Sequence, residues 1–277
     1  MFKAVCLFVV LLAVGTHAFA QDEILKSYLR GGMLAVNEGE YSKAESLFKS
    51  AIAEINKSSL TNDLKISAMI VSLNGLGMAL SNQQKDAEAE AVTRKLIGLM
   101  EQTNRTDESD YATALNNLGL MLSKEKKFDE ATEVHRKALS LREKQLGSTH
   151  PDVAVSLLNL GKVYFDEGRF VQAEAVLDRA VAILTTIPVE SQSDESMIAL
   201  ATCDMNLASI KVGQKKFQEA EQLLLIALMI RTKLQGATHP DLVEPLRRYA
   251  LLLRQTNRPT DAANMEARIR LIQLQNP

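Results

Sequence analysis

A period of about 42 residues runs along this chain of 277 residues. An alanine preceded twelve positions earlier by glycine or alanine recurs six times, at intervals of 43, 44, 42, 47 and 42 residues. These alanines are Ala44, Ala87, Ala131, Ala173, Ala220 and Ala262, and their partners are Gly32, Gly75, Gly119, Gly161, Ala208 and Ala250. Because chance rarely gives small residues at all twelve positions, we interpret the period as a structural repeat.

Each repeat has the pattern of two helices joined by a short break. In the fourth repeat Gly168 lies in that break and suits the left-handed conformation that ends a helix. The apolar residues on either side recur at helical spacing and are Leu157, Leu160 and Tyr164 before the break and Leu177, Ala180 and Leu184 after it. A single hairpin of this kind cannot bury both of its faces, so we expect it to stack on its neighbours.

The pattern Leu157-x2-Leu160-Gly161-x2-Tyr164, followed by Ala173-x3-Leu177, resembles the tetratricopeptide repeat. The connector at 146–154 recurs in looser form at 234–243, and with the 42-residue period it resembles the kinesin-light-chain type of that repeat. The resemblance is specific over residues 109–250 and weaker over 22–108 and 251–272. It implies an all-α solenoid, a right-handed superhelix of six stacked hairpins whose first helices line a concave surface.

The repeats divide the expected solenoid domain, residues 21–277, into six helix pairs. We place these pairs at about 22–58, 62–103, 109–146, 150–187, 195–235 and 239–274. The polar stretch 188–196 lengthens one connector and explains the 47-residue interval. In the last repeat Glu266 replaces an apolar residue, as expected for a terminal cap that faces water.

Residues 1–20 have the layout of a secretory signal peptide. Ala4 to Val14 is an apolar run, and Ala18-Phe19-Ala20 places small residues where cleavage occurs. The run rises about 16 Å as a helix, well short of a hydrocarbon core of about 30 Å, so we favour cleavage over a retained anchor. We expect an exported protein, in the bacterial periplasm by preference, with eukaryotic secretion and use of the Asn56 and Asn104 sequons left open.

The charge balance and the missing motifs narrow the function. The 32 basic and 34 acidic residues give a net charge of −2, which predicts neither a nucleic-acid nor a membrane-surface partner. The sequence has no HExxH, CxxC or G-x-S-x-G motif, and His150 and His239 occupy the same place in two connectors. We therefore predict no catalytic residue, cofactor or metal site, and a protein that is not an enzyme.

A polar position recurs two residues before the small glycine or alanine. It holds Arg30, Leu73, Asn117, Asn159, Asn206 and Arg248 in the six repeats. Side-chain amides both donate and accept hydrogen bonds, so a ladder of them suits an extended peptide backbone. We predict that Asn117, Asn159 and Asn206, with Arg30 and Arg248 at the ends and Lys124 and Lys162 nearby, contact a partner. The alternative is that the asparagines order the contacts between helices.

The sequence as a whole predicts an exported, non-catalytic scaffold that binds a peptide or protein in a concave groove. Two other roles stay open: a structural or oligomerising component of the cell envelope, and an enzyme or enzyme subunit acting on envelope polymers. The residues identify neither the partner nor the oligomeric state.

Overall fold

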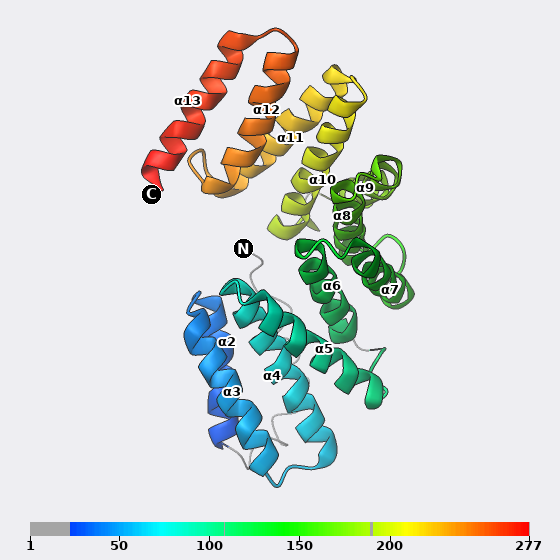
Figure 1. Ribbon diagram of the computed structural model, residues 1–277, viewed down its shortest axis with the longest axis vertical. Helices are drawn as coiled ribbons and strands as arrows, with labels where there is room; N and C mark the ends of the chain where they lie inside the picture. Colours follow the sequence, from blue (N-terminus) through cyan, green and yellow to red (C-terminus); the bar gives the residue numbers. More distant parts are fainter. Residues whose placement is uncertain (1–22, 108, 189–190, 277) are drawn as a thin grey trace. The chain divides into compact units, whose positions relative to one another are not determined.

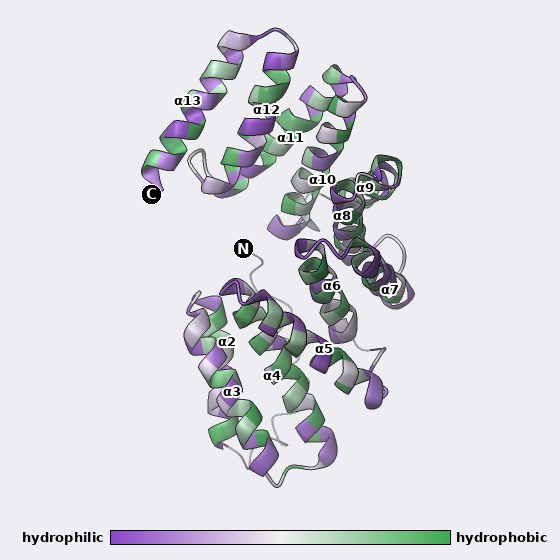
Figure 2. Ribbon diagram, viewed as in Figure 1, coloured by the Kyte–Doolittle hydropathy of each residue, from purple (hydrophilic) through white to green (hydrophobic). Residues whose placement is uncertain are grey.

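The computed structural model describes residues 23–107, 109–188 and 191–276 (Figure 1). In these segments the chain forms twelve α-helices and no β-strand. Polar and apolar residues alternate in bands along most of the helices, as expected for helices that bury one face (Figure 2). The all-α class and the hairpin repeat are therefore confirmed, whereas the signal peptide expected at residues 1–20 lies outside the described residues.

The helices form two compact units. The first unit ends at Glu125 and the second begins at Lys126. The first contains α2 (Glu23–Asn37), α3 (Tyr41–Lys57), α4 (Asn62–Asn82), α5 (Asp86–Gln102) and α6 (Ser109–Lys124). The second contains α7 (Phe128–Leu146), α8 (Pro151–Asp166), α9 (Phe170–Thr185), α10 (Asp194–Gly213), α11 (Phe217–Gln235), the short 3₁₀ helix η2 (Pro240–Leu242), α12 (Val243–Gln255) and α13 (Pro259–Gln275). The third expected hairpin, α6 and α7, is divided between the two units.

Within each unit every helix packs on the next one along the chain. The first helices of successive hairpins also meet, since α2 contacts α4 in the first unit, and α10 contacts both α8 and α12 in the second. Contact between equivalent helices of neighbouring repeats is the pattern that defines a solenoid.

The hairpin tips share one backbone geometry. Five residues before each buried central alanine, the chain takes a positive φ between 58° and 83°. The second helix then begins two residues later. Only two of the six tip residues are glycine; the six are Gly39, Gln84, Lys126, Gly168, Lys215 and Asn257.

This shared geometry corrects the register of the second repeat by two residues. Its left-handed residue is Gln84 and α5 starts at Asp86, so the central alanine is Ala89, which is fully buried, and not Ala87, which is exposed. The expected equivalence of Ala87 was therefore wrong. The sequence pattern misplaced it because alanine occurs at both positions, and no aromatic residue marks the start of α5 as it does in four other repeats.

The small residues let two helices approach closely. A Cβ atom at Gly161 of α8 would lie 2.7 Å from Cγ of Leu177 in α9, closer than real Cβ contacts allow. In the first unit the ring of Phe48 takes the place of Leu177 and lies against both Gly32 and Gly75. Larger side chains at these glycines would push the helices apart.

A glutamate that follows the central alanine ties three hairpins to the tip of the next one. Glu45 accepts hydrogen bonds from Nε2 of Gln83 and Nζ of Lys85 at 2.9 and 2.8 Å. Hydrogen bonds from Lys49, Lys85 and Gln83 lower the pKa of Glu45 to about 2. The equivalent Glu174 accepts from Gln214 and Lys211, and Glu221 accepts from Tyr249 and Arg258. These charge-assisted bonds fix the stacking of one repeat on the next.

Length and composition alone would let α4 cross a membrane, which is true of no other helix in the described segments. In its most apolar stretch, however, 61% of the residues are buried inside the protein. This burial is typical of a core helix in a solenoid.

Candidate functional site

The second unit brings three of the predicted partner-binding residues into one column. Asn159 lies on α8, Asn206 on α10 and Arg248 on α12, at equivalent positions of helices that contact one another. The two asparagines are only 9% and 8% exposed. Both residues are therefore mostly buried among the helices, and each leaves only a small part of its surface to a partner.

Arg248 bonds to the neighbouring repeat. Its Nη1 donates to the carbonyl oxygen of Met205 at 3.1 Å and to the hydroxyl of Ser209 at 3.0 Å, both on α10. Its Nε donates to Glu244 of its own helix at 2.8 Å. The guanidinium thus links α12 to α10 and is only partly available to a ligand.

Lys162 stands on α8 next to this column and is the most accessible of the predicted residues in the second unit. Its Nζ pairs with the carboxylate of Asp166 at 2.5 Å, and more than half of the lysine side chain is exposed. Exposed ion pairs contribute little to stability, so Lys162 and Asp166 are free to exchange their bond for one to a ligand.

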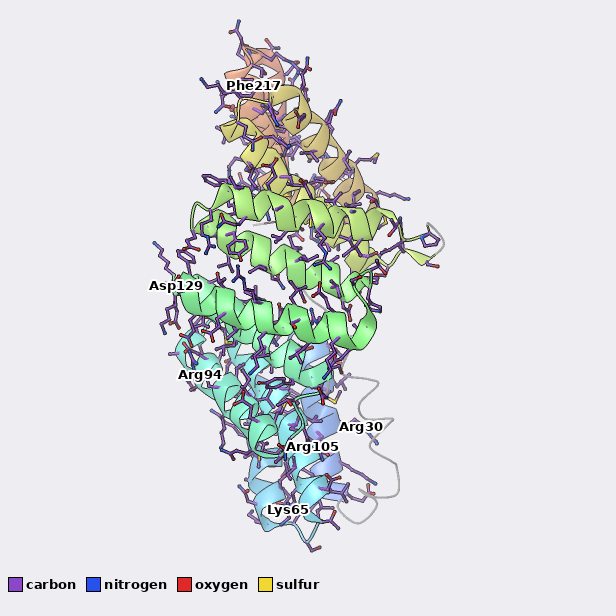
Figure 3. All side chains as sticks on the ribbon, turned by 90° about the vertical axis from the view of Figure 1, so that its right-hand side faces the viewer. Arg30, Lys65, Arg94, Arg105, Asp129 and Phe217 are labelled. Atoms are coloured by element: carbon purple, nitrogen blue, oxygen red, sulfur yellow. The ribbon has the colours of Figure 1, made fainter. Side chains whose placement is uncertain are left out.

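In the first unit the predicted residues do not form a continuous ladder. Arg30 is exposed on α2, where Figure 3 labels it, and Asn117 is half-buried on α6. With the corrected register, the position between them on α4 is Gly75 and not Leu73. Lys124, at the end of α6, pairs with Asp86 of α5 at 3.1 Å.

Asp204 is a buried carboxyl group that the sequence analysis did not identify. It lies on α10, is 3% exposed, and occupies the position that Leu157 and Leu246 fill in the neighbouring repeats. Burial raises the pKa of Asp204 to about 7. An alignment of the six repeats would have shown it as the single acidic residue in an otherwise apolar column.

The connector histidines act as helix caps. Nδ1 of His150 accepts a hydrogen bond from the backbone N–H of Asp152 at 3.1 Å, and His239 does the same for Asp241 at 3.2 Å. In the described segments, no group of three or more His, Cys, Asp or Glu side chains is arranged to hold a metal ion. The one described cysteine, Cys203, is buried, and burial raises the pKa of its thiol.

A family model described as tetratricopeptide repeat matches residues 110–186 and 198–270, which is more than half of the chain. The chain belongs to the tetratricopeptide repeat family. No curated protein sequence matches it.

Solved tetratricopeptide structures share the fold at low sequence identity. BtubC (BKLC) from P. vanneervenii is 15% identical with a TM-score of 0.68, covering 85% of this chain and 91% of that one. A putative kinesin light chain from Podosopora anserina, with nearly identical TPR-like repeats, is 21% identical with a TM-score of 0.60, covering 76% and 96%. The quorum sensor NprR from B. thuringiensis is 14% identical with a TM-score of 0.71, covering 97% and 74%. At these identities the likeness establishes the fold, and the second structure agrees with the kinesin-light-chain type of repeat.

Proposed function

We propose that this tetratricopeptide protein is an exported, non-catalytic scaffold that binds a peptide or protein along the first-helix face of its second unit. The observation that carries the proposal is the polar column of Asn159, Asn206 and Arg248 on three contacting helices, with the exposed Lys162–Asp166 pair beside it. The column supplies hydrogen-bonding edges, and the exposed pair supplies both signs of charge.

The peptide part of the proposal draws on a structural neighbour. NprR has been solved in complex with its cognate peptide NprX, and that structure covers 97% of this chain with a TM-score of 0.65. The non-catalytic part rests on the family, because tetratricopeptide repeats generally act as interaction modules. Turnover by the purified protein that a single acidic or histidine substitution abolishes would contradict it.

Export is supported by the apolar run at Ala4–Val14 and by the small residues that follow it. Fractionation of cells that make the natural protein tests this part, together with the N-terminal sequence of the recovered chain. A mature chain that starts near Gln21 in the periplasm or medium is expected. A full-length chain in the cytoplasm would contradict export and leave the binding face untouched.

The binding face is tested once crosslinking and mass spectrometry of the native protein has identified a neighbour. We expect the double variant Lys162→Glu, Asn206→Ala to weaken binding of that neighbour at least tenfold. The two substitutions together remove a positive charge and a side-chain amide from the binding face. The matched control is Gln172→Glu on the exposed side of α9. Unchanged affinity in a variant that keeps its thermal unfolding temperature would remove this face from the proposal.

A further inference from the structure

The outer face of α11 carries three large apolar side chains that water reaches. Leu225, Ile226 and Met229 are 46%, 41% and 64% exposed, and their spacing puts them on one face of the helix. The buried residues of α11, among them Leu224 and Leu228, belong to the core and face the other way. Figure 3 labels Phe217, where this helix begins.

The repeat itself shows that these positions need not be apolar. In α9 the equivalent residues are Asp178, Arg179 and Ala182. Lysine, arginine, serine, alanine or glycine fills them in the earlier repeats; the residues are Lys49, Ser50 and Ala53 in α3, Arg94, Lys95 and Gly98 in α5, and Arg136, Lys137 and Ser140 in α7. In α13 the equivalents are Ala267, Arg268 and Leu271, of which only Leu271 is a large apolar residue, and it is 59% exposed. Among the second helices of the described hairpins, α11 alone therefore has large apolar residues at all three positions, and clustered exposed apolar residues mark contact surfaces.

The charges at the two ends of this cluster have opposite signs. Glu219 lies seven residues before Ile226, and Lys233 lies seven residues after it. Seven residues are two helical turns, so both charged side chains lie on nearly the same face as Ile226, about 10 Å from it in opposite directions. Both are exposed.

Two copies of this helix face have complementary charges when the helices run in opposite directions. Two α11 helices that meet antiparallel across a two-fold axis at Ile226 would place Lys233 of each copy opposite Glu219 of the other. A two-fold contact of this kind uses the same patch on both copies. A parallel arrangement would oppose like charges, so the charge order selects the antiparallel pair.

We propose that the outer face of α11 is a contact between two copies of this chain, with Leu225, Ile226 and Met229 at its centre. This contact goes beyond the proposed function, because it uses the second helix of the fifth repeat and leaves the first-helix face of each copy available. One helix face buries less than the roughly 800 Å² per partner of a standard stable interface. The dimer is therefore weak, with dissociation in the micromolar range or above.

The mass of the purified chain in solution tests the contact by sedimentation or light scattering across 1–200 μM protein. We expect the mean mass to rise from that of one chain toward that of two. Met229→Lys should weaken dimerisation at least tenfold, because it buries a charge at the centre of the contact. Its matched control is Ala182→Lys, the same replacement at the equivalent exposed position of α9, which should leave dimerisation unchanged.

Variants that exchange the charges of Glu219 and Lys233 distinguish the antiparallel contact from a general effect on stability. Lys233→Glu and Glu219→Lys should each weaken the dimer, and the double variant should restore it, since every copy again carries complementary ends. Glu219 also pairs with Lys211 of α10 at 3.0 Å, but Lys211 keeps Glu174 as a partner at 2.8 Å, so the fold tolerates the exchange.

Three outcomes would overturn the proposal. They are a wild-type chain that stays a monomer at 200 μM, a dimer that Met229→Lys leaves intact, and a double charge variant that stays weak although it folds. If the wild type is monomeric and Met229→Lys instead releases a different protein, the patch belongs to that protein and the dimer is refuted.

Discussion

The fourth hairpin, α8 and α9, and the fifth, α10 and α11, have the same backbone geometry and different chemistry on it. Both tips take a positive φ, at Gly168 and at Lys215, and both second helices bury a central alanine. Inside the hairpin, Leu157 of the fourth repeat is replaced by Asp204 of the fifth. Outside it, the polar and small residues of α9 are replaced by the apolar cluster of α11.

The comparison shows which positions the repeat requires. The small residues and the left-handed tip are kept because they set how closely and at what angle two helices meet. The buried carboxyl of Asp204 and the exposed apolar cluster of α11 are not needed for that geometry. At these positions one hairpin can therefore differ from its neighbour in stability and in contacts.

The largest effect is expected when the buried carboxyl group of the fifth hairpin, Asp204, is replaced. We expect Asp204→Leu to stabilise the protein by about 4 kcal/mol at pH 8, given that one pKa unit corresponds to about 1.4 kcal/mol and the two pKa values differ by about three units. The pKa of the folded state is about 7 and that of an unfolded aspartate is near 4. The unfolded chain therefore loses its proton first, and the wild type loses stability as the pH rises from about 4 to 7. Urea unfolding at pH 4.5 and pH 8 measures the difference.

Two variants complete that test. Asp204→Asn removes the charge but keeps a polar group, so it should remove the part of the pH dependence that Asp204 causes, with a smaller gain in stability. The reverse change, Leu157→Asp, should bring the pH dependence into the fourth hairpin. Stability curves of wild type and Asp204→Leu that run parallel over pH would show that Asp204 is not the titrating group.

An effect of intermediate size on stability is expected at the small-residue position, which both hairpins have. Replacing Gly161 with Leu should destabilise by roughly 1–3 kcal/mol, because the new side chain meets Leu177 in a filled contact. The same replacement at the exposed Gln172 should cost little. Equal shifts in the denaturant midpoint for the two variants would mean that the small-residue position does not control the helix contact.

The smallest effect concerns the tips. Lys215→Gly should stabilise the fifth hairpin by up to about 1 kcal/mol, since glycine takes the left-handed conformation without the cost that a side chain brings. Gly168→Lys should destabilise the fourth hairpin by a similar amount. Thermal unfolding of the two single variants decides the point, and shifts of the same sign would contradict a shared tip geometry.

Much of the fold was predictable because it depends on spacing. The period, the small residues and the helical apolar stripes identify the repeat from the sequence alone. The second repeat was misplaced by two residues because alanine occurs at both 87 and 89, and α5 begins with Asp86 where α3, α7, α9 and α11 begin with an aromatic residue. Propensity alone does not reveal a strained residue that tertiary packing holds in place.

The candidate site was less predictable than the fold. The position of Asn159 and Asn206 on contacting helices follows from the repeat, but their burial depends on neighbouring side chains that the sequence does not place. Arg248 was expected to face a partner, and its bonds to Met205 and Ser209 require the stacking of α12 on α10. Asp204 was missed because the repeats were compared at their small residues and not at their apolar columns.

The six tips carry a practical consequence. Glycine, glutamine, lysine and asparagine all occupy the same left-handed position, so this point of the loop is set by its neighbours and tolerates varied side chains. A cysteine or an affinity tag introduced at the four tips that already carry a side chain, Gln84, Lys126, Lys215 and Asn257, is expected to disturb the helices little. These four tips are therefore suitable attachment points for fluorescent or spin labels that would report distances along the array.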